Sequence, residues 1–416
     1  MAAVEIADGI HWVGALDPKL RSFDIILSTA NGTTYNSYTV RGPNGVAVID
    51  TVKQEFADEF FSNLEEVTSY DDITSIVLNH LEPDHTGALP ELIRRAPQAQ
   101  VYISRRAPGM LKALLKPDME DFHFIAVDTG SELNLGGRTL TFLNTPYLHW
   151  PDTQCTFDNQ TGTLFSGDLF GCHFCDERLF NDQVGDFRFS FEYYFNMIMR
   201  PFKEHVIDAL DLIEPLEPKL VACAHGPILR DHPMEYIQRY HEMAAPQLKR
   251  DLSEDEKSLL IFYISAYGST ARMAEAIKAG AEEVPNVRVS LFDLEGGQVS
   301  PFIDLVEDAD GLAFGSPTIN GDAAKPIWDL LSSCASIKTQ GKMGAAFGSY
   351  GWTGEAVEMI EARMRGLKLR VPVAGLKLKL TPSEQELVGC EAFGKELAEH
   401  LTGQNAPRVI DLAALG

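Results

Sequence analysis

The stretch His80-Leu81-Glu82-Pro83-Asp84-His85 places four side chains that can bind a metal within six positions. It follows residues 73–79, whose apolar run predicts a strand, and precedes residues 86–96, whose apolar spacing predicts a helix. Imidazole and carboxylate groups this close together are costly unless cations bind them, and such a mixed set suits first-row metals. The alternative is a polar turn that only caps a helix starting near Thr86. We predict a metal site in a loop between a strand and a helix.

The same arrangement, a predicted strand followed by a polar side chain, occurs three more times. Residues 139–145 lead to His149, residues 163–166 lead to Asp168, and residues 219–224 lead to His225. A lone histidine is more often an ordinary core or surface group, so each of the three is weak support by itself. Together with residues 80–85 they predict a single metal site.

The order of these residues resembles the metallo-β-lactamase fold, with Glu82 where hydrolases of that fold usually carry a second histidine. A carboxylate is a harder ligand than imidazole and adds negative charge, so it favours iron over zinc. Seven ligands suffice for two metal ions if Asp168 bridges them. We predict His80, Glu82 and His149 on one ion, and Asp84, His85 and His225 on the other.

The segment Cys172-His173-Phe174-Cys175 follows Asp168 closely. A single C-x-x-C pattern without a second pair is weak support for a metal or redox site. We interpret these cysteines as structural thiols that pack beneath the predicted metal site.

Composition narrows the class of protein. The 416 residues include 35 basic and 60 acidic side chains, a formal net charge of −25, which disfavours nucleic acid and anionic membranes as partners. Six scattered cysteines are too few for a secreted disulfide framework. The amino terminus lacks the features of a signal peptide, and no apolar stretch approaches the roughly 20 residues that span a bilayer. We expect a cytoplasmic protein that does not associate with membranes.

Two domains are predicted. The first part alternates short strands and helices, and a charged segment at residues 249–257 separates it from the apolar run at residues 258–264. From there strand, loop and helix alternate regularly, as in a doubly wound open sheet. The predicted fold class is α/β: a metallo-β-lactamase-like αββα sandwich over residues 1–250 and a flavodoxin-like, doubly wound parallel sheet over residues 251–416.

Three loops of the second domain follow predicted strands and carry small, hydroxyl and aromatic residues. Their backbone N–H groups and hydroxyls suit a phosphate, and Tyr350 or Trp352 suits a stacked planar ring. The alternative for Trp352 is plain packing. The loops resemble short-chain flavodoxin and its FMN site; the predicted contacts are Ser265, Tyr267, Gly268, Ser269, Thr270, Ser316, Pro317, Thr318, Ile319, Asn320, Ser349, Tyr350, Gly351, Trp352 and Gly354.

The two halves together resemble the flavodiiron proteins, also called A-type flavoproteins. The stretch Gly32-Thr33-Thr34-Tyr35-Asn36-Ser37-Tyr38 also resembles an early strand signature of that family. The resemblance implies reduction of O2 to water, of NO to N2O, or both, with FMN passing electrons to two non-haem iron ions. It further implies a head-to-tail homodimer or a homotetramer. An external donor would supply electrons, such as rubredoxin, an NAD(P)H-linked reductase or a reduced deazaflavin.

The resemblance also suggests catalytic residues near the iron ions. Members often carry a histidine near the position of Asp24, which this chain replaces, and a tyrosine in the segment that matches Glu192-Tyr193-Tyr194-Phe195. We therefore take Asp24, Tyr193 and Tyr194 as candidates. The loss of that histidine leaves the preference between O2 and NO open.

The alternative functions are a di-zinc hydrolase and an electron-transfer flavoprotein. A di-zinc hydrolase joined to a flavodoxin domain is opposed by Glu82 and by the lack of a reason for a hydrolase to carry FMN. An electron-transfer flavoprotein with a vestigial first half is opposed by the complete set of predicted ligands.

Overall fold

The computed structural model describes residues 1–23, 27–115, 123–245, 253, 255–296 and 302–404. The chain divides into two compact units, Met1–Ala245 and Pro246–Gly416. Within the described residues, every helix is too short or too polar to cross a bilayer.

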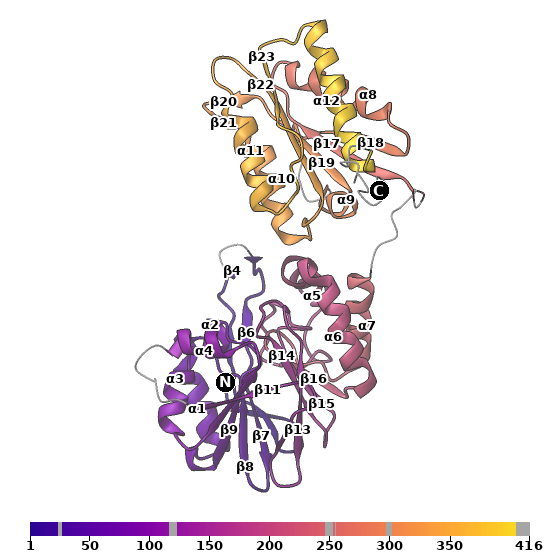
Figure 1. The fold of residues 1–416 in the computed structure, drawn as a ribbon. Helices are drawn as coiled ribbons and strands as arrows, with labels where there is room; N and C mark the ends of the chain where they lie inside the picture. Colours follow the sequence, from indigo (N-terminus) through magenta and orange to yellow (C-terminus); the bar gives the residue numbers. More distant parts are fainter. Residues whose placement is uncertain (24–26, 116–122, 246–252, 254, 297–301, 405–416) are drawn as a thin grey trace. The chain divides into compact units, whose positions relative to one another are not determined.

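The first unit contains two large sheets and two short strand pairs (Figure 1). The seven-stranded sheet has the order β1 (Val4–Ala7), β2 (Ile10–Trp12), β7 (Tyr38–Gly42), β8 (Gly45–Ile49), β9 (Ile73–Val77), β10 (Gln100–Ser104) and β11 (Phe124–Val127). The five-stranded sheet has the order β12 (Glu132–Asn134), β13 (Thr139–Asn144), β14 (Gln154–Asp158), β15 (Thr163–Gly167) and β16 (Leu220–Cys223). The short pairs are β3 (Ala15–Asp17) with β6 (Thr33–Tyr35) and β4 (Ser22–Phe23) with β5 (Leu27–Ser28).

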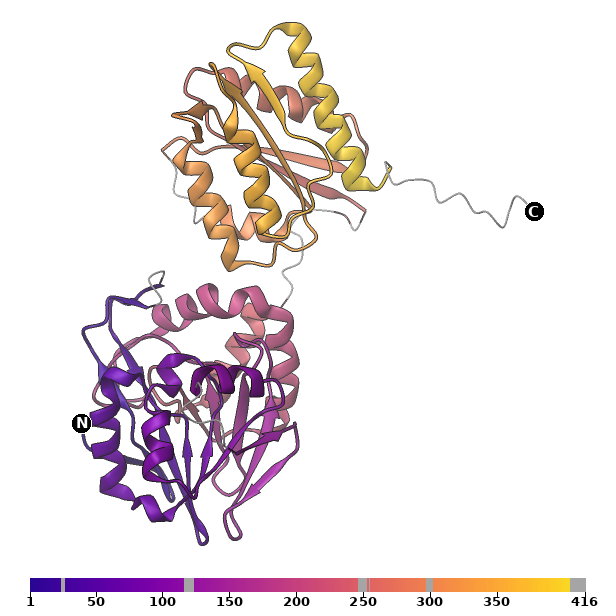
Figure 2. The same cartoon turned by 60° about the vertical axis from the view of Figure 1, so that its left-hand side comes forward.

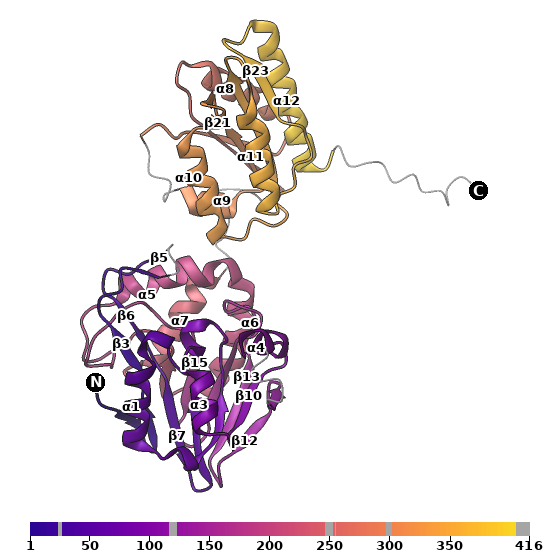
Figure 3. The ribbon, with the colours of Figure 1, turned by 90° about the vertical axis from the view of Figure 1, so that its left-hand side faces the viewer.

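Helices cover the outer face of each sheet in this unit, as Figure 3 shows. Alternate residues of the strands point inward, so that Val40 and Val77 from one sheet share a core cluster with Leu140 and Phe165 from the other. The helices are α1 (Ala57–Val67), α2 (Pro83–Thr86), α3 (Leu89–Arg95), α4 (Pro108–Leu115), α5 (Arg188–Tyr194), α6 (Lys203–Ile213) and α7 (Pro233–Ala244). This arrangement is the predicted αββα sandwich.

The second unit is a parallel five-stranded sheet with helices on both faces (Figure 2). Its strand order is β18 (Val287–Asp293), β17 (Lys257–Tyr263), β19 (Gly311–Gly315), β22 (Met343–Tyr350) and β23 (Leu376–Lys379), with a small hairpin of β20 (Thr318–Ile319) and β21 (Asp322–Ala323). The helices are α8 (Ser269–Glu282), α9 (Ile303–Asp308), α10 (Lys325–Ser333), α11 (Glu355–Gly366) and α12 (Glu384–Thr402). The strand order 2-1-3-4-5 is that of flavodoxin-like folds, and the predicted fold class is confirmed.

Helices α8 and α12 cross closely on one face of this sheet. An added methyl group on Gly280 would collide with the carbonyl oxygen of Glu391, and one on Gly394 would collide with that of Ile277. The two glycines therefore allow the helix backbones to touch.

Candidate functional site

Strands from both large sheets of the first unit end at the predicted metal ligands. His80 follows β9 of the seven-stranded sheet, and Asp168 and His225 follow β15 and β16 of the five-stranded sheet. His149 lies in the loop between β13 and β14. The sandwich thus brings residues separated by up to 145 positions into one cluster.

One detail of the prediction is wrong: Asp84 and His85 lie on a short helix, α2, and not in a loop. Pro83 occupies its first turn, where a fixed φ favours helix and the missing N–H costs nothing. The hydroxyl of Thr86 donates to the carbonyl of Glu82 at 2.9 Å and closes the turn. Because the turn is helical, Asp84 and His85 both face the cluster although they are adjacent in sequence.

Asp168 faces two groups of side chains, one with each carboxylate oxygen. Its Oδ2 lies 3.3 Å from Nε2 of His149 and 3.7 Å from Nε2 of His80. Oε2 of Glu82 lies 3.1 Å and 3.2 Å from the same two nitrogens. These atoms form the first half of the cluster.

The second half surrounds the other oxygen. Oδ1 of Asp168 lies 3.2 Å from Nε2 of His85 and 3.5 Å from Nε2 of His225. The oxygens of Asp84 approach the same nitrogens, at 3.4 Å for His85 and 3.1 Å for His225. Of the three carboxylates among the seven predicted ligands, Asp168 is therefore the one with an oxygen facing each half.

Several of these buried atoms lack a hydrogen bond of acceptable geometry. These atoms are the two carboxylate oxygens of Asp84, Oδ1 of Asp168 and Nε2 of His85. Leaving a buried polar atom unpaired costs about 1–3 kcal/mol, so a set of them pointing at one another needs an explanation. Potential ligand atoms of His80, Glu82, His85 and Asp168 lie within 4.8 Å of one another, and those of Asp84, His85 and His225 do too. The donor set fits a pair of cations.

The charges of the cluster are consistent with this fit. Burial alone would lower the pKa of His80, His85 and His149, but the surrounding carboxylates raise each to about 10. Burial alone would raise the pKa of Asp168, but the neighbouring histidines hold that pKa well below its usual range. Without metal, protons on the imidazoles balance the carboxylates; bound cations would take the place of those protons.

Asp152 orients His80 and was missed in the sequence. Its buried Oδ2 lies 3.1 Å from Nδ1 of His80 and accepts from the backbone N–H of Leu81 at 2.7 Å. Such a carboxylate–histidine contact fixes the ring so that Nε2 points at a metal. The only signal in the sequence was an aspartate three residues after His149.

Residues 32–38, the stretch that resembles an early strand signature of the family, orient His225. Nδ1 of His225 donates to the carbonyl of Thr34 at 2.6 Å, and the N–H of Gly226 donates to the Thr34 hydroxyl at 2.7 Å. The amide of Asn36 donates to the carbonyls of Cys223 and Gly226, both at 2.9 Å. Strand β6 and its continuation therefore hold the loop that carries His225.

The three predicted catalytic residues have different positions. The ring of Tyr194 is buried and lies 6.4 Å from that of His225. Tyr193 instead stacks on the exposed Phe189, with ring centroids 5.8 Å apart, and the structure does not bring it to the cluster. Asp24 lies outside the described residues.

The Cys-His-Phe-Cys segment contributes a residue that sequence reasoning missed, His173. Its buried ring lies 5.3 Å from that of His225 and 5.1 Å from that of Tyr194. Burial, followed by the nearby His225, lowers its pKa to about 3. Cys172 is buried, Cys175 is half-buried, and both are free thiols.

The predicted flavin loops meet in the second unit at the carboxyl ends of β17, β19 and β22. The point where strand order reverses lies between β17 and β19, and open α/β sheets bind ligands at that point. The hydroxyls of Thr270 and Ser349 lie 3.0 Å apart and join the first loop to the third. The second loop, Ser316–Asn320, runs into the β20–β21 hairpin.

These loops leave open space and uncovered aromatic rings. Gly268 has a φ of +81°, and no atom would lie within 4 Å of a methyl group there. Tyr267 is 98% exposed and Trp352 is 78% exposed, so Trp352 is not a packing residue within the described second unit. An open backbone loop flanked by free aromatic rings fits a phosphate joined to a planar ring.

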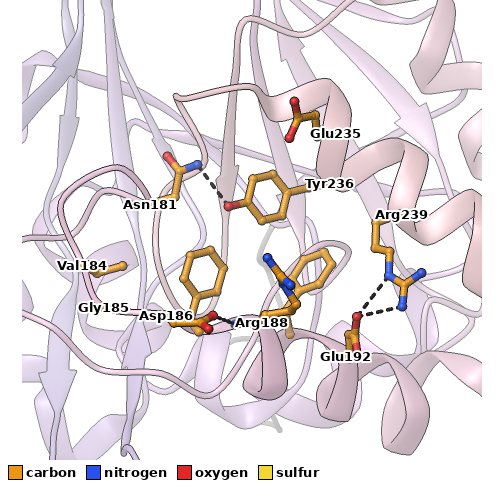
Figure 4. A pocket seen from close by; sticks show the side chains of 11 residues that line it. Asn181, Val184, Gly185, Asp186, Arg188, Glu192, Glu235, Tyr236 and Arg239 are labelled. Carbon is orange, nitrogen blue, oxygen red and sulfur yellow. Dashed lines mark hydrogen bonds and ion pairs between the residues drawn. The ribbon is translucent and has the colours of Figure 1, made fainter.

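A separate pocket of about 360 Å³ opens beside α5 and α7 (Figure 4). The amide of Asn181 donates to the hydroxyl of Tyr236 at 3.3 Å, and Arg239 pairs with Glu192 at the other end. None of the predicted metal or flavin residues lines it. The pocket is lined by Asn181, Val184, Gly185, Asp186, Phe187, Arg188, Phe191, Glu192, Glu235, Tyr236 and Arg239.

Family models match both units. Residues 33–226 match the ODP family beta lactamase, and residues 261–394 match flavodoxin. These two ranges contain all seven predicted metal ligands and all the predicted flavin loops.

Known proteins resemble the chain over nearly its full length. A type A flavoprotein, fprA, of Rhodobacter capsulatus is 61% identical over 99% of this chain and 94% of its own. An anaerobic nitric oxide reductase flavorubredoxin of Pectobacterium carotovorum is 35% identical over 95% of this chain and 78% of its own. The solved structure of rubredoxin oxygen:oxidoreductase from Desulfovibrio gigas, 28% identical, superposes with a TM-score of 0.67 and covers 97% of this chain and all of that one. With this similarity spanning both units, the chain belongs to the flavodiiron proteins, the type A flavoproteins.

Proposed function

We propose that this protein is a flavodiiron oxidoreductase that reduces O2 to water, NO to N2O, or both. The position of Asp168 carries the proposal, because its two oxygens face two separate sets of buried donors. Glu82 adds a carboxylate where a zinc hydrolase of this fold would have imidazole, which favours iron. The relatives do not favour the di-zinc hydrolase.

Seven side chains would hold the iron ions: His80, Glu82 and His149 on one, Asp84, His85 and His225 on the other, and Asp168 between them. FMN would lie on the three loops of the second unit. When bound, the two irons would bind the gas and deliver electrons together, and the flavin would supply them.

The protein's own residues do the remaining work. Asp152 and the carbonyl of Thr34 orient His80 and His225, so that both present Nε2 to the cluster. Most residues of the cluster and the ring of Tyr194, which lies 6.4 Å from the ring of His225, are buried away from bulk water. Exclusion of water strengthens every electrostatic interaction within the site.

Names of relatives support both gases and an external donor. One relative is called a nitric oxide reductase, and one solved structure is called a rubredoxin oxygen:oxidoreductase. We further propose that an external electron donor, such as rubredoxin or a reductase, serves the protein. We also propose that it forms a head-to-tail homodimer or homotetramer and is located in the cytoplasm. The functional domains would be residues 1–250 and 251–416.

The test is an analysis of protein purified without oxygen. Elemental analysis and an absorption spectrum are expected to give about two Fe and one FMN per chain. Parallel assays of O2 and NO consumption, with rubredoxin and a reductase as the electron source, would then assign the gas. Two Zn per chain, with no consumption of either gas by correctly metallated protein, would overturn the proposal.

A further inference from the structure

Among the described residues, His173 is the histidine that adjoins the cluster without being one of the seven predicted ligands. It is only 6% exposed, and its Nε2 has no hydrogen-bond partner. Rings of Phe23, Tyr194 and His225 surround it, at centroid distances of 4.3, 5.1 and 5.3 Å. Among the described residues, no group makes a hydrogen bond to this buried nitrogen, and a buried polar atom needs such a partner.

The contact of Thr33 with the other ring nitrogen, Nδ1, favours one tautomer of His173. The hydroxyl of Thr33 lies 2.9 Å from Nδ1 of His173 and donates to the carbonyl of Thr34 at 3.3 Å. A hydroxyl whose proton is directed at that carbonyl can only accept from Nδ1. In that arrangement Nδ1 carries the proton and Nε2 presents a lone pair. A second proton on Nε2 would be an unsatisfied buried donor beside the cations that the cluster is built to hold.

Strand β6 contacts the Nδ1 atoms of two histidines. The carbonyl of Thr34 accepts from Nδ1 of His225, and the hydroxyl of the preceding residue, Thr33, lies 2.9 Å from Nδ1 of His173. In both cases the ring is fixed and Nε2 is left free. Nε2 of His225 faces two carboxylates of the cluster, whereas His173 adjoins Tyr194 instead.

We propose that His173 is a positioning residue, whose Nε2 accepts a hydrogen bond from an O–H group beside the metal cluster. The O–H group is either the hydroxyl of Tyr194 or a water molecule in the site. Reduction of O2 or NO consumes protons. An acceptor that orients an O–H group beside the cluster fixes the position of that group's proton. This catalytic consequence rests on the proposed function; the hydrogen bond itself does not.

The hydrogen bond can be tested without turnover. Full-length protein with ¹⁵N-labelled histidine is loaded with Zn²⁺, which is diamagnetic, and its nitrogen resonances are recorded by NMR. We expect one histidine, assigned by its loss in His173→Gln, to carry its proton on Nδ1 and to show a hydrogen-bonded, unprotonated Nε2. A protonated or zinc-bound Nε2 would overturn the proposal, whatever the enzyme reduces.

Two variants separate the possible sources of the O–H group and test the role of Thr33. In Tyr194→Phe, a shift of the Nε2 resonance identifies the tyrosine as the donor, and an unchanged, still hydrogen-bonded resonance identifies water. Thr33→Val, which keeps the shape but removes the acceptor, is expected to mix the two tautomers while the zinc content stays the same.

A matched pair of substitutions tests the catalytic consequence. His173→Gln keeps an acceptor near the position of Nε2, whereas His173→Asn keeps a donor toward Thr33 but does not reach that position. Loss of one hydrogen bond predicts that the Asn variant turns over about tenfold more slowly than the Gln variant, at equal iron and FMN content. Equal turnover rates for the two variants would show that His173 serves only for packing.

Discussion

Asp168 is the residue whose loss should have the largest effect on the metal content. Asp168→Ala removes an oxygen from each half of the cluster, so we expect the bound iron to fall by more than half. The flavin absorption should not change, because the flavin loops belong to the other unit. Elemental analysis beside a visible spectrum measures both quantities. Asp208→Ala, on the exposed side of α6, is the control, and an unchanged iron content in Asp168→Ala would disprove the bridging role.

The histidines of the cluster predict how stability depends on pH in the metal-free protein. In the folded chain the pKa of His80, His85 and His149 is about 10, above the ordinary value of 6.5. Their contribution to stability is therefore complete below pH 6.5 and is lost as the pH rises toward 10. Urea unfolding of chelator-treated protein should give a lower free energy of unfolding at pH 9 than at pH 7.

Metal-loaded protein provides the comparison for this pH series. Its histidines are already deprotonated when they bind metal, so the decline between pH 7 and pH 9 should be smaller. Equal declines with and without metal would show that these three histidines do not hold the metal.

At the scale of elements, the crossing of α8 and α12 offers a matched test. Gly280→Ala places a methyl group against the backbone of Glu391 and is expected to destabilise the second unit by about 1–3 kcal/mol. Gly389→Ala adds the same group on the exposed face of α12, where no atom lies within 4 Å, and should be neutral or stabilising by up to about 1 kcal/mol. Chemical denaturation followed by circular dichroism measures both; equal effects would contradict a close helix contact.

Elements that depend on local pattern were predictable from the sequence. The run at residues 258–264 corresponds to β17, and the run at residues 73–79 contains β9. The short α2 was not predicted, because four residues are too few to show a helical period. Asp152 and His173 were missed for a different reason: their roles come from partners 72 and 140 positions away, at His80 and Thr33.

At the scale of the whole molecule, the two units carry separate sites, so each should respond to its own ligand. A calorimetric scan is expected to show two transitions, and chelation of the metal should lower only one of them. Removal of FMN should lower the other. Fluorescence of the exposed Trp352, measured against the Trp352→Phe variant, shows which of the two transitions is the unfolding of the second unit. A single transition that shifts as a whole with either ligand would contradict independent units.

The pairing of β3 with β6 is three residues long, with Leu16 opposite Thr34 and Asp17 opposite Thr33. A slip of one residue would turn every side chain of β6 to the opposite face and would separate Thr33 and Thr34 from the histidines they hold. A newly made chain with that error would offer an incomplete set of ligands. Uptake of iron would then discriminate between correctly and incorrectly paired chains, and a misfolded copy would remain metal-free and open to proteolysis.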